Sequence, residues 1–260
     1  MPFLYESRQH KRTARESLDC ALALHELCNM GVDNIITFDA HDPRVQNSIP
    51  LNGFETVQPT YQFIKGLLNN VDDLTIDAEH MMVVSPDEGG MSRAIYIANV
   101  LGLDMGMFYK RRDYSTIVNG KNPIVAHEFL GDTVEGKDYV IIDDMIASGG
   151  SMLDVCKQIK ARGARRVFIC TTFGLFTEGI KKFDEYYEQG MFTKLITTNL
   201  TYRPPELLRR EYYIQADMFD YMARIIDTLN HDQSMVAVKN TTSKITNKLS
   251  EIMKDLTEPS

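Results

Sequence analysis

The stretch YVIIDDMIASGGS at residues 139–151 joins an apolar segment, two adjacent carboxylates and a glycine turn in immediate succession. The run 139–142 predicts a strand, and the apolar spacing that follows Ser151 predicts a helix. Ser151 and Asp154 have the spacing of a capping box at the start of this helix. The β-rich segment 167–172 predicts the next parallel strand. The order strand, loop, helix and strand therefore predicts one unit of a parallel α/β sheet.

The loop in this unit suits a phosphate held at the start of a helix. The glycines of the turn 148–151 let backbone N–H groups approach an anion, and its serines add hydroxyl donors beside the positive end of the helix dipole. Asp143 and Asp144 would repel a phosphate, so we expect them to bind sugar hydroxyls or a Mg²⁺ that bridges a sugar and a pyrophosphate. Each feature alone is also common as ordinary structure in α/β domains, whereas their succession in this order favours a functional loop.

The composition is that of an ordinary globular protein. Of the 260 residues, 43% are hydrophobic and 25% are charged, which suits one large or two small domains. The net charge of −8 argues against a general nucleic-acid-binding protein. Because the sequence has no apolar run long enough for a membrane span and no signal-peptide core, we expect a cytoplasmic protein without a membrane role. The four cysteines lack metal-ligand spacing, so we expect reduced thiols.

Strand and helix patterns alternate along most of the chain. We expect strands at 35–38, 81–85 and 105–109, and helices at 15–30, 61–68 and 92–101. Residues 1–5 are expected to form the end of a strand, 52–59 a turn region, and 113–127 a long flexible loop. The alternation predicts an α/β fold with a mostly parallel sheet and helices on both faces. Such sheets bind ligands at the carboxyl ends of their strands.

The C-terminal part of the chain differs in composition. From Asn230 the sequence becomes polar, and residues 242–256 carry apolar side chains at helical spacing. We expect an amphipathic helix there, docked on this chain or on a partner. Since its polar face carries charges of both signs, we do not expect it to bind a membrane.

The phosphate loop resembles the phosphoribosyl-pyrophosphate loop of the type I phosphoribosyltransferase fold. Transferases that consume phosphoribosyl pyrophosphate share this fold with the ribose-phosphate pyrophosphokinases that make it, so the loop alone does not choose between them. Other segments resemble motifs of the pyrophosphokinases and occur in the same order along the chain: 5–16, 37–41, 83–90 followed by Arg93, 108–112, and 197–199. On these motifs the chain is similar to ribose-phosphate pyrophosphokinases from about residue 3 to residue 228.

The resemblance implies a reaction and its catalytic residues. Pyrophosphate would pass from Mg-ATP to ribose 5-phosphate, giving 5-phosphoribosyl 1-pyrophosphate and AMP. Lys110 and Arg112 match the positions of the cations that stabilise charge on the ATP phosphates during transfer. A basic triplet such as 110–112 is by itself more often a solvated turn, but its shared sheet edge with the other motifs favours the functional interpretation. The resemblance also implies Mg²⁺ as cofactor and a homo-oligomer.

The resemblance assigns binding residues as well. His41 and Asp87 would hold the Mg²⁺, and Arg8 and Gln9 would contact ATP. The ribose 5-phosphate site would contain the two adjacent carboxylates and the loop after them: Asp143, Asp144, Ala147, Ser148, Gly149, Gly150 and Ser151.

The chain departs from the family pattern at several points. Ala147 and Ser148 stand where the family usually has Asp-Thr, and His10 stands where an Asp is usual. The family's first domain begins well before Met1. The resemblance thus implies a partial N-terminal pyrophosphokinase domain at 1–58, a phosphoribosyltransferase-type domain at 59–229, and a polar linker with the amphipathic helix at 230–260.

Two other functions remain open from the sequence. One is a phosphoribosyltransferase that uses phosphoribosyl pyrophosphate, and the other is a non-catalytic regulatory relative of the synthetase. Because the partial first domain buries little surface of its own, we expect this chain to self-associate or to be marginally stable. We also expect it to make little phosphoribosyl pyrophosphate until the missing N-terminal segment is restored.

Overall fold

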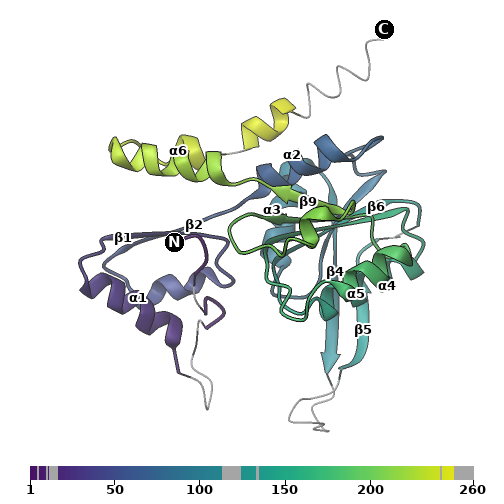
Figure 1. The fold of residues 1–260 in the computed structure, drawn as a ribbon, viewed down its shortest axis with the longest axis horizontal. Coiled ribbons are helices and arrows are strands. Elements are labelled where there is room, and N and C mark those ends of the chain that lie inside the picture. Colours follow the sequence, from purple (N-terminus) through teal and green to yellow (C-terminus); the bar gives the residue numbers. More distant parts are fainter. Residues whose placement is uncertain are drawn as a thin grey trace.

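The computed structural model describes residues 1–4, 6–9, 11, 17–112, 124–132, 135–240 and 242–248, and for 110–112 and 124–127 it describes the backbone alone. Within these residues, seven strands form one sheet in the order β5-β4-β3-β6-β7-β8-β9 (Figure 1). Their bounds are Met81–Ser85 (β3), Asp104–Arg112 (β4), Ile124–Leu130 (β5), Asp138–Ile146 (β6), Arg166–Gly174 (β7), Lys194–Thr198 (β8) and Tyr213–Ala216 (β9). Neighbouring strands run parallel except β4 and β5, so the predicted mostly parallel sheet is confirmed.

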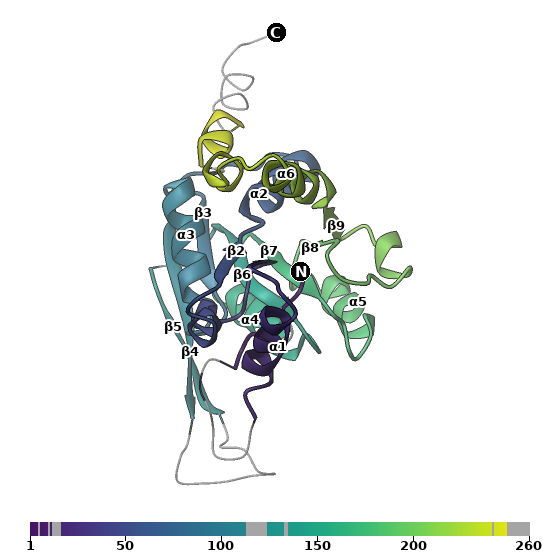
Figure 2. The ribbon, with the colours of Figure 1, turned by 90° about the vertical axis from the view of Figure 1, so that its left-hand side faces the viewer.

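Helices cover both faces of this sheet (Figure 2). Their bounds are Thr60–Asn70 (α2), Met91–Leu101 (α3), Gly150–Ala161 (α4) and Lys181–Glu188 (α5). Phe63 of α2 and Ile97 of α3 share one buried cluster with Val83 of the sheet. Leu153 of α4 and Phe183 of α5 belong to the other buried cluster. Successive strand residues alternate between the two clusters because side chains of a strand point to opposite faces in turn.

A smaller unit precedes this domain. In the described part of the chain, β1 (Asn34–Phe38) and β2 (Gly53–Val57) pair in parallel as a two-stranded sheet. Helix α1 (Asp19–Asn29) and the 3₁₀ helix η1 (Pro43–Ser48) pack beside it around a small buried cluster that includes Leu4. The strand β2 lies within 52–59, where we expected a turn region, so that prediction is wrong.

The N-terminal residues correct another expectation. Residues 1–4 form no strand. Leu4 is instead buried against α1 and β1, and the ring of Phe3 packs edge-on to Phe173 with centroids 4.6 Å apart. Apolar side chains at this end of the chain therefore serve as packing between the small unit and the main sheet.

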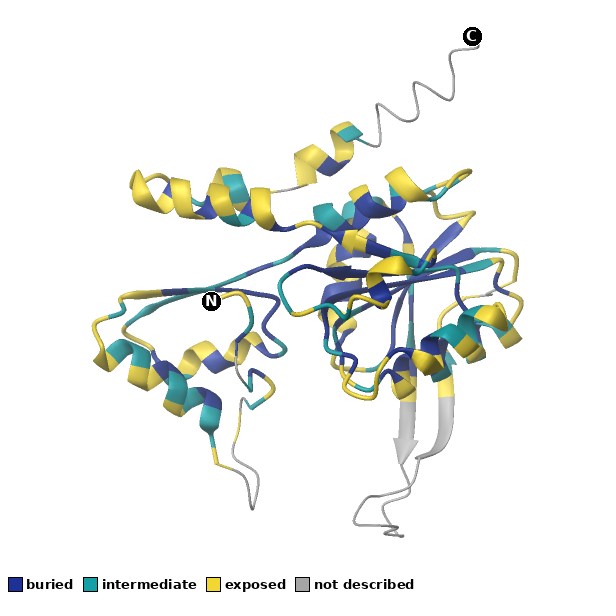
Figure 3. Ribbon diagram, in the orientation of Figure 1, coloured by how far each residue is buried: buried dark blue, intermediate teal, exposed yellow. Residues whose placement is uncertain are grey.

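The long helix α6 (Phe219–Asn230) ties the two parts together. Tyr221 and Ile225 of α6 share a buried cluster with Phe38 of β1, Val57 of β2 and Phe173 of β7. Figure 3 shows that the rest of α6 is largely exposed. A short helix α7 (Val236–Lys239) follows, and residues 242–248 are helical as predicted, with Ile245 fully buried. The predicted continuation of that helix at 249–256 lies outside the described residues.

Two local predictions differ from the structure. Residues 124–127 belong to β5, so the expected loop at 113–127 is wrong there, while 113–123 lie outside the described residues. Helix α4 begins at Gly150 with Gly149 as its N-cap, and no side chain caps this described helix start, so the expected capping box at Ser151 is not formed. No helix in the described part of the chain is long and apolar enough to cross a bilayer.

Candidate active site

Two cavities open where β1, β3 and β6 end. The larger, of about 700 Å³, is lined by residues that include Arg8 and His41. The smaller, of about 200 Å³, is lined by Asp87, Asp143 and the loop 147–151. Residues far apart in the sequence are thus brought together at the carboxyl edge of the sheet, where parallel α/β sheets bind their ligands.

The phosphate-loop candidate has a backbone that only glycine adopts readily. Gly149 has φ of +85°, in the left-handed region. A Cβ at this position would lie 2.4 Å from Cζ of Phe183, a core residue of α5. The turn is therefore held between the sheet and α5, and it leads directly into α4. Because the first N–H groups of a helix lack intrahelical partners, they are available to an anion at this loop.

A buried ionic network joins the turn after β1 to α3. Arg93 Nε donates to Asp39 Oδ1 at 2.6 Å, and its Nη2 donates to the backbone oxygens of Ala40 at 3.1 Å and His41 at 3.2 Å. Asp39 also accepts from the hydroxyl of Thr172. Burial raises the pKa of Asp39, and the charge of Arg93 counteracts that rise. The guanidinium thus fixes the turn that presents His41.

The same turn is linked to β6 through its histidine. His41 Nδ1 lies 2.9 Å from Asp144 Oδ2, and Arg93 Nη1 lies 3.8 Å from Asp144 Oδ1. The hydrogen bond to Asp144 raises the pKa of His41 above its ordinary value, although burial opposes this. Burial also opposes ionisation of Asp144, but the hydrogen bond with His41 and the charge of Arg93 outweigh it and lower the Asp144 pKa.

The two adjacent carboxylates therefore differ in character. Burial, together with the charge of Asp144, raises the pKa of Asp143 well above its ordinary value. Asp144 is the partner of His41, whereas Asp143 lines the smaller cavity beside the phosphate loop. Of the pair, Asp143 is consequently the carboxylate placed to meet a ligand in that cavity.

The turn after β3 contributes to both cavities, because Asp87 lines the smaller one and Glu88 and Gly89 line the larger one. Ser85 Oγ donates to the backbone oxygen of Asp87 at 2.6 Å, and the Gly89 N–H donates to Asp87 Oδ1 at 3.0 Å. A Cβ at Gly90 would approach the backbone oxygen of Ile142 to 3.3 Å, so this turn packs closely against β6. The charge of Asp87 acts on both His41 and Asp143, which places the three groups in one electrostatic cluster.

The donor atoms of this cluster suit a magnesium ion that takes only a few ligands from the protein and the rest from water and substrate. Among the described residues, no three His, Cys, Asp or Glu side chains come together as a complete metal site. Asp144 occupies Nδ1 of His41, which leaves Nε2 as the ring nitrogen for a metal. One imidazole nitrogen and the Asp87 carboxylate suit Mg²⁺, which binds through few protein ligands together with phosphates and waters.

The proposed catalytic cations lie on an extension of the sheet. Strand β4 pairs with β3 up to Met107 and then continues, paired antiparallel with β5, through Lys110 and Arg112. The ladder with β5 shifts register between Arg111 and Arg112. The backbones of Lys110 and Arg112 thus leave the sheet at the same carboxyl edge that carries Asp87, while the side chains of these two residues lie outside the described structure.

The two predicted ATP contacts are placed differently. Arg8 lines the larger cavity, where its Nε donates to Glu6 Oε2 at 2.9 Å. Gln9 is not among the described residues that line it, and its Oε1 instead accepts from the Cys20 backbone N–H at 3.2 Å, near the start of α1. Gln9 therefore anchors α1 in this structure.

Comparisons with known proteins agree with this geometry. A model of the phosphoribosyl transferase domain matches residues 54–202. The ribose-phosphate pyrophosphokinase of Vibrio vulnificus is 30% identical over 244 residues, covering 92% of this chain and 72% of that protein. The chain belongs to the ribose-phosphate pyrophosphokinase family. The family's enzyme from Shewanella oneidensis is likewise 30% identical over 241 residues, covering 92% of this chain and 71% of its own length.

A solved structure of the family gives the same fold. The phosphoribosylpyrophosphate synthetase from Mycobacterium smegmatis superposes with a TM-score of 0.73 at 22% identity, covering 89% of this chain and 70% of that one. At this identity the likeness establishes the fold and leaves the residue roles to the local geometry.

Sequence reasoning missed part of this family member's site. The sequence motifs contain Asp39 and Arg93 but assign neither a role, and Thr172 is expected only as the end of a strand. A signal for Arg93 was present, because an arginine in the apolar pattern of α3 is buried and must find a partner. Its partner Asp39 has φ of +39°, which the sequence does not reveal.

Proposed function

We propose that the chain transfers pyrophosphate from Mg-ATP to ribose 5-phosphate, giving AMP and 5-phosphoribosyl 1-pyrophosphate. The observation that carries this proposal is a pair of cavities that share the turn at 87–89. The phosphate loop and Asp143 line the smaller cavity, and His41 and Arg8 line the larger one. A transfer between two phosphorylated substrates needs two such neighbouring sites. Membership of the ribose-phosphate pyrophosphokinase family supports the same assignment.

Ribose 5-phosphate would occupy the smaller cavity. Its phosphate would accept from backbone N–H groups at the start of α4 and from the hydroxyls of Ser148 and Ser151. Asp143 would accept from ribose hydroxyls, and Ala147 contributes backbone alone. Asp144 would position His41 and would not bind the sugar, because its carboxylate is already paired with the His41 ring.

The nucleotide would occupy the larger cavity, with Arg8 beside it. Magnesium held by His41 and Asp87 would neutralise charge on the phosphates. The 1-hydroxyl oxygen of ribose would form a bond to the β-phosphorus, and the bond from that phosphorus to the bridging oxygen of the α-phosphate would break. AMP would leave, and the hydroxyl proton would pass to solvent. Lys110 and Arg112 would stabilise the charge that develops on the phosphoryl oxygens.

Calorimetry with ribose 5-phosphate and Mg²⁺ tests the assignment of the smaller cavity. The wild type should bind with one site per chain, and Asp143→Asn should weaken binding about tenfold or more, because it loses charge-assisted bonds to the sugar hydroxyls. Asp132→Asn, on an exposed residue outside both cavities, should bind as the wild type does. Equal affinity in the Asp143→Asn and Asp132→Asn variants would remove Asp143 from the site.

A homo-oligomeric, cytoplasmic enzyme belongs to the same proposal. The exposed apolar side chains of Phe219, Ile226 and Leu229 on α6 support self-association, because they follow one another at helical spacing. Light scattering of the purified chain measures this directly. A monomer at all concentrations would contradict the oligomeric part of the proposal.

A further inference from the structure

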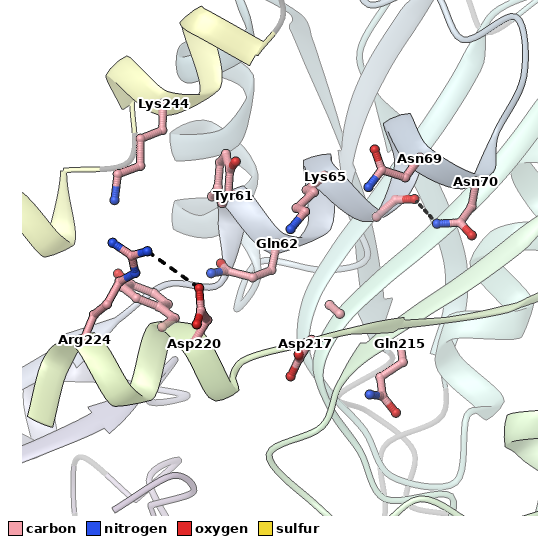
Figure 4. Close-up of a pocket in the computed structure, with 13 residues that line it drawn as sticks. Tyr61, Gln62, Lys65, Asn69, Asn70, Gln215, Asp217, Asp220, Arg224 and Lys244 are labelled. Atoms are coloured by element: carbon pink, nitrogen blue, oxygen red, sulfur yellow. Dashed lines mark hydrogen bonds and ion pairs between the residues drawn. The ribbon is translucent and has the colours of Figure 1, made fainter.

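A third cavity, of about 360 Å³, lies between α2, the start of α6 and the helix at 242–248 (Figure 4). Its described lining residues are shared with neither cavity of the candidate active site. Three cations line it, each from a different segment: Lys65 of α2, Arg224 of α6 and Lys244 of the last described helix. Segments distant in the sequence thus converge on one basic cavity in a protein whose net charge is −8.

These cations are only partly neutralised. Among the described residues, neither Lys65 nor Lys244 has a carboxylate within ion-pair distance, and Arg224 Nη2 lies 3.7 Å from a carboxylate of Asp220 that is 91% exposed. In Figure 4 the side chains of Arg224 and Lys244 point toward one another. Two like charges directed into the same cavity repel unless an anion lies between them.

The second carboxylate that lines the cavity, that of Asp217, already accepts hydrogen bonds from other groups. Asp217 Oδ1 accepts from Asn199 Nδ2 at 2.7 Å and from the Phe219 N–H at 3.1 Å. These bonds fix Asp217 at the start of α6. The bond from the Phe219 N–H, together with the charge of Lys65, holds the pKa of Asp217 below its ordinary value. Three cations line the cavity with two carboxylates, Asp217 and Asp220, so one positive charge remains in excess for a ligand.

The uncharged side chain of Gln62 adds a second requirement for the ligand. Oε1 of Gln62 is buried and has no hydrogen-bond partner among the described residues. A buried acceptor without a donor is costly. A rotation of the Gln62 side chain, which lines the cavity, would turn this oxygen toward a ligand hydroxyl or amino group. The cavity is also larger than inorganic phosphate requires, and Tyr61 lines it beside Gln62.

We propose that this cavity binds a small phosphate monoester that also carries a hydroxyl or amino donor. The phosphate lies among Lys65, Arg224 and Lys244, and the donor group bonds to Gln62 Oε1. This site is independent of the proposed pyrophosphate transfer. Binding ties the helix at 242–248 to α2, because each segment supplies a cation to the same phosphate.

Hydrogen exchange with sn-glycerol 3-phosphate as the probe locates the site. Exchange should slow in α2 and in residues 242–248. Exchange in the phosphate loop at 147–151 is measured separately, so that binding at the candidate active site can be distinguished. Calorimetry on the same samples should show saturable binding that weakens about tenfold in Lys244→Gln, since one charge-assisted hydrogen bond is lost. Lys181→Gln, which removes an exposed charge on α5 outside the cavity, should bind as the wild type does.

Two further comparisons separate the two halves of the proposal. Methyl phosphate, a monoester without a donor, should bind more weakly than glycerol 3-phosphate in the wild type and equally in Gln62→Leu. Glycerol alone should give no protection. Protection confined to 147–151, or equal affinity in Lys244→Gln and Lys181→Gln, would overturn the proposal.

Discussion

Arg93 and Asp39 form a buried ion pair, with Nε of the guanidinium 2.6 Å from Oδ1 of the carboxylate. The pair joins helix α3 of the main domain to the turn that follows β1 of the small unit. Further bonds from Arg93 to the backbone oxygens of Ala40 and His41 hold the same turn. The position of His41 over Asp144 therefore depends on an arginine that lies outside the predicted site residues.

Removal of this arginine should destabilise the protein strongly. Arg93→Met leaves the Asp39 carboxylate buried without its cation, and breaking a buried pair in this way costs about 3–5 kcal/mol of unfolding free energy. Urea denaturation of Arg93→Met measures the loss, with Arg209→Met on an exposed arginine as the control. Arg93→Lys should restore only part of the stability, because an ammonium lacks the planar fork that reaches Asp39 and the two carbonyls together. Similar midpoints for the Met variants at 93 and 209 would contradict the account.

The glycine turn before α4 offers a matched pair of substitutions. Gly149 and Gly179 both have positive φ, but a Cβ at 149 would clash with the Phe183 ring, whereas one at 179 meets nothing within 4 Å. Gly179→Ala should cost about 1 kcal/mol from backbone strain, and Gly149→Ala should cost about 1–3 kcal/mol more from overpacking. Thermal or chemical denaturation compares the two.

The larger Gly149→Val change should also abolish ribose 5-phosphate binding. The added side chain displaces the loop from Phe183, so the N–H groups at the start of α4 move away from the phosphate. Calorimetry in the presence of Mg²⁺ checks this, and Gly179→Val serves as the control. Wild-type affinity in folded Gly149→Val would reject the loop as the phosphate site.

The cations on β4 should act on the transition state. Lys110→Ala should lower kcat by about two orders of magnitude or more while changing KM for ATP much less, since the charge it stabilises develops during transfer. Arg112→Ala should behave in the same way. Lys157→Ala removes an exposed charge on α4 and should leave both constants unchanged. A near-normal kcat in Lys110→Ala would reduce the triplet at 110–112 to a basic turn.

An ionic group at the start of β6 should make the unfolding free energy depend on pH. Asp138 is buried and accepts from Arg165 at 2.6 Å and from Arg166 at 2.7 Å. Burial raises its pKa, but the bonds from the two arginines outweigh burial and hold the pKa below its ordinary value. A lowered folded-state pKa stabilises the protein at pH above the unfolded value of about 3.9, and this stabilisation is lost as the pH falls through the folded value.

Asp138→Asn should therefore be less stable at neutral pH and should lose less stability on acidification. Unfolding free energies between pH 7 and pH 3 measure the two slopes. Because the pair lies at the opposite end of β6 from Asp143, substrate affinity should not change. An equally steep acid loss in the variant would show that other carboxylates account for it.

The sequence predicted the sheet where one strong local signal decided the structure. The strand β3 carries five buried residues and was predicted to the residue, because a continuous apolar run between turns has few alternatives. The two-stranded sheet was harder to predict from the sequence. Gly53–Val57 carries mostly half-buried residues, and its identity as β2 depends on pairing with β1 and on packing under α6.

The sequence proposes members of the site but not the contacts that connect them. Asp143 and the loop 147–151 follow from strand, turn and helix order, which is local information. The link between His41 and Asp144 joins positions 103 residues apart, and no spacing rule relates them. Likewise, the orphaned Gln62 oxygen and the basic cavity around it exist only once α2, α6 and the tail helix are packed together.

The central claim is pyrophosphate transfer, and phosphorus NMR of the reaction mixture tests it most directly. The purified chain is incubated with Mg²⁺, ATP and ribose 5-phosphate. The account predicts that AMP and a pyrophosphate ester at the ribose 1-position appear together in equal amounts. Neither should form without ribose 5-phosphate or with Lys110→Ala in place of the wild type. A low yield of the two products in equal amounts would agree with the weak activity expected of this chain, whereas release of ADP and inorganic phosphate in their place would contradict the account.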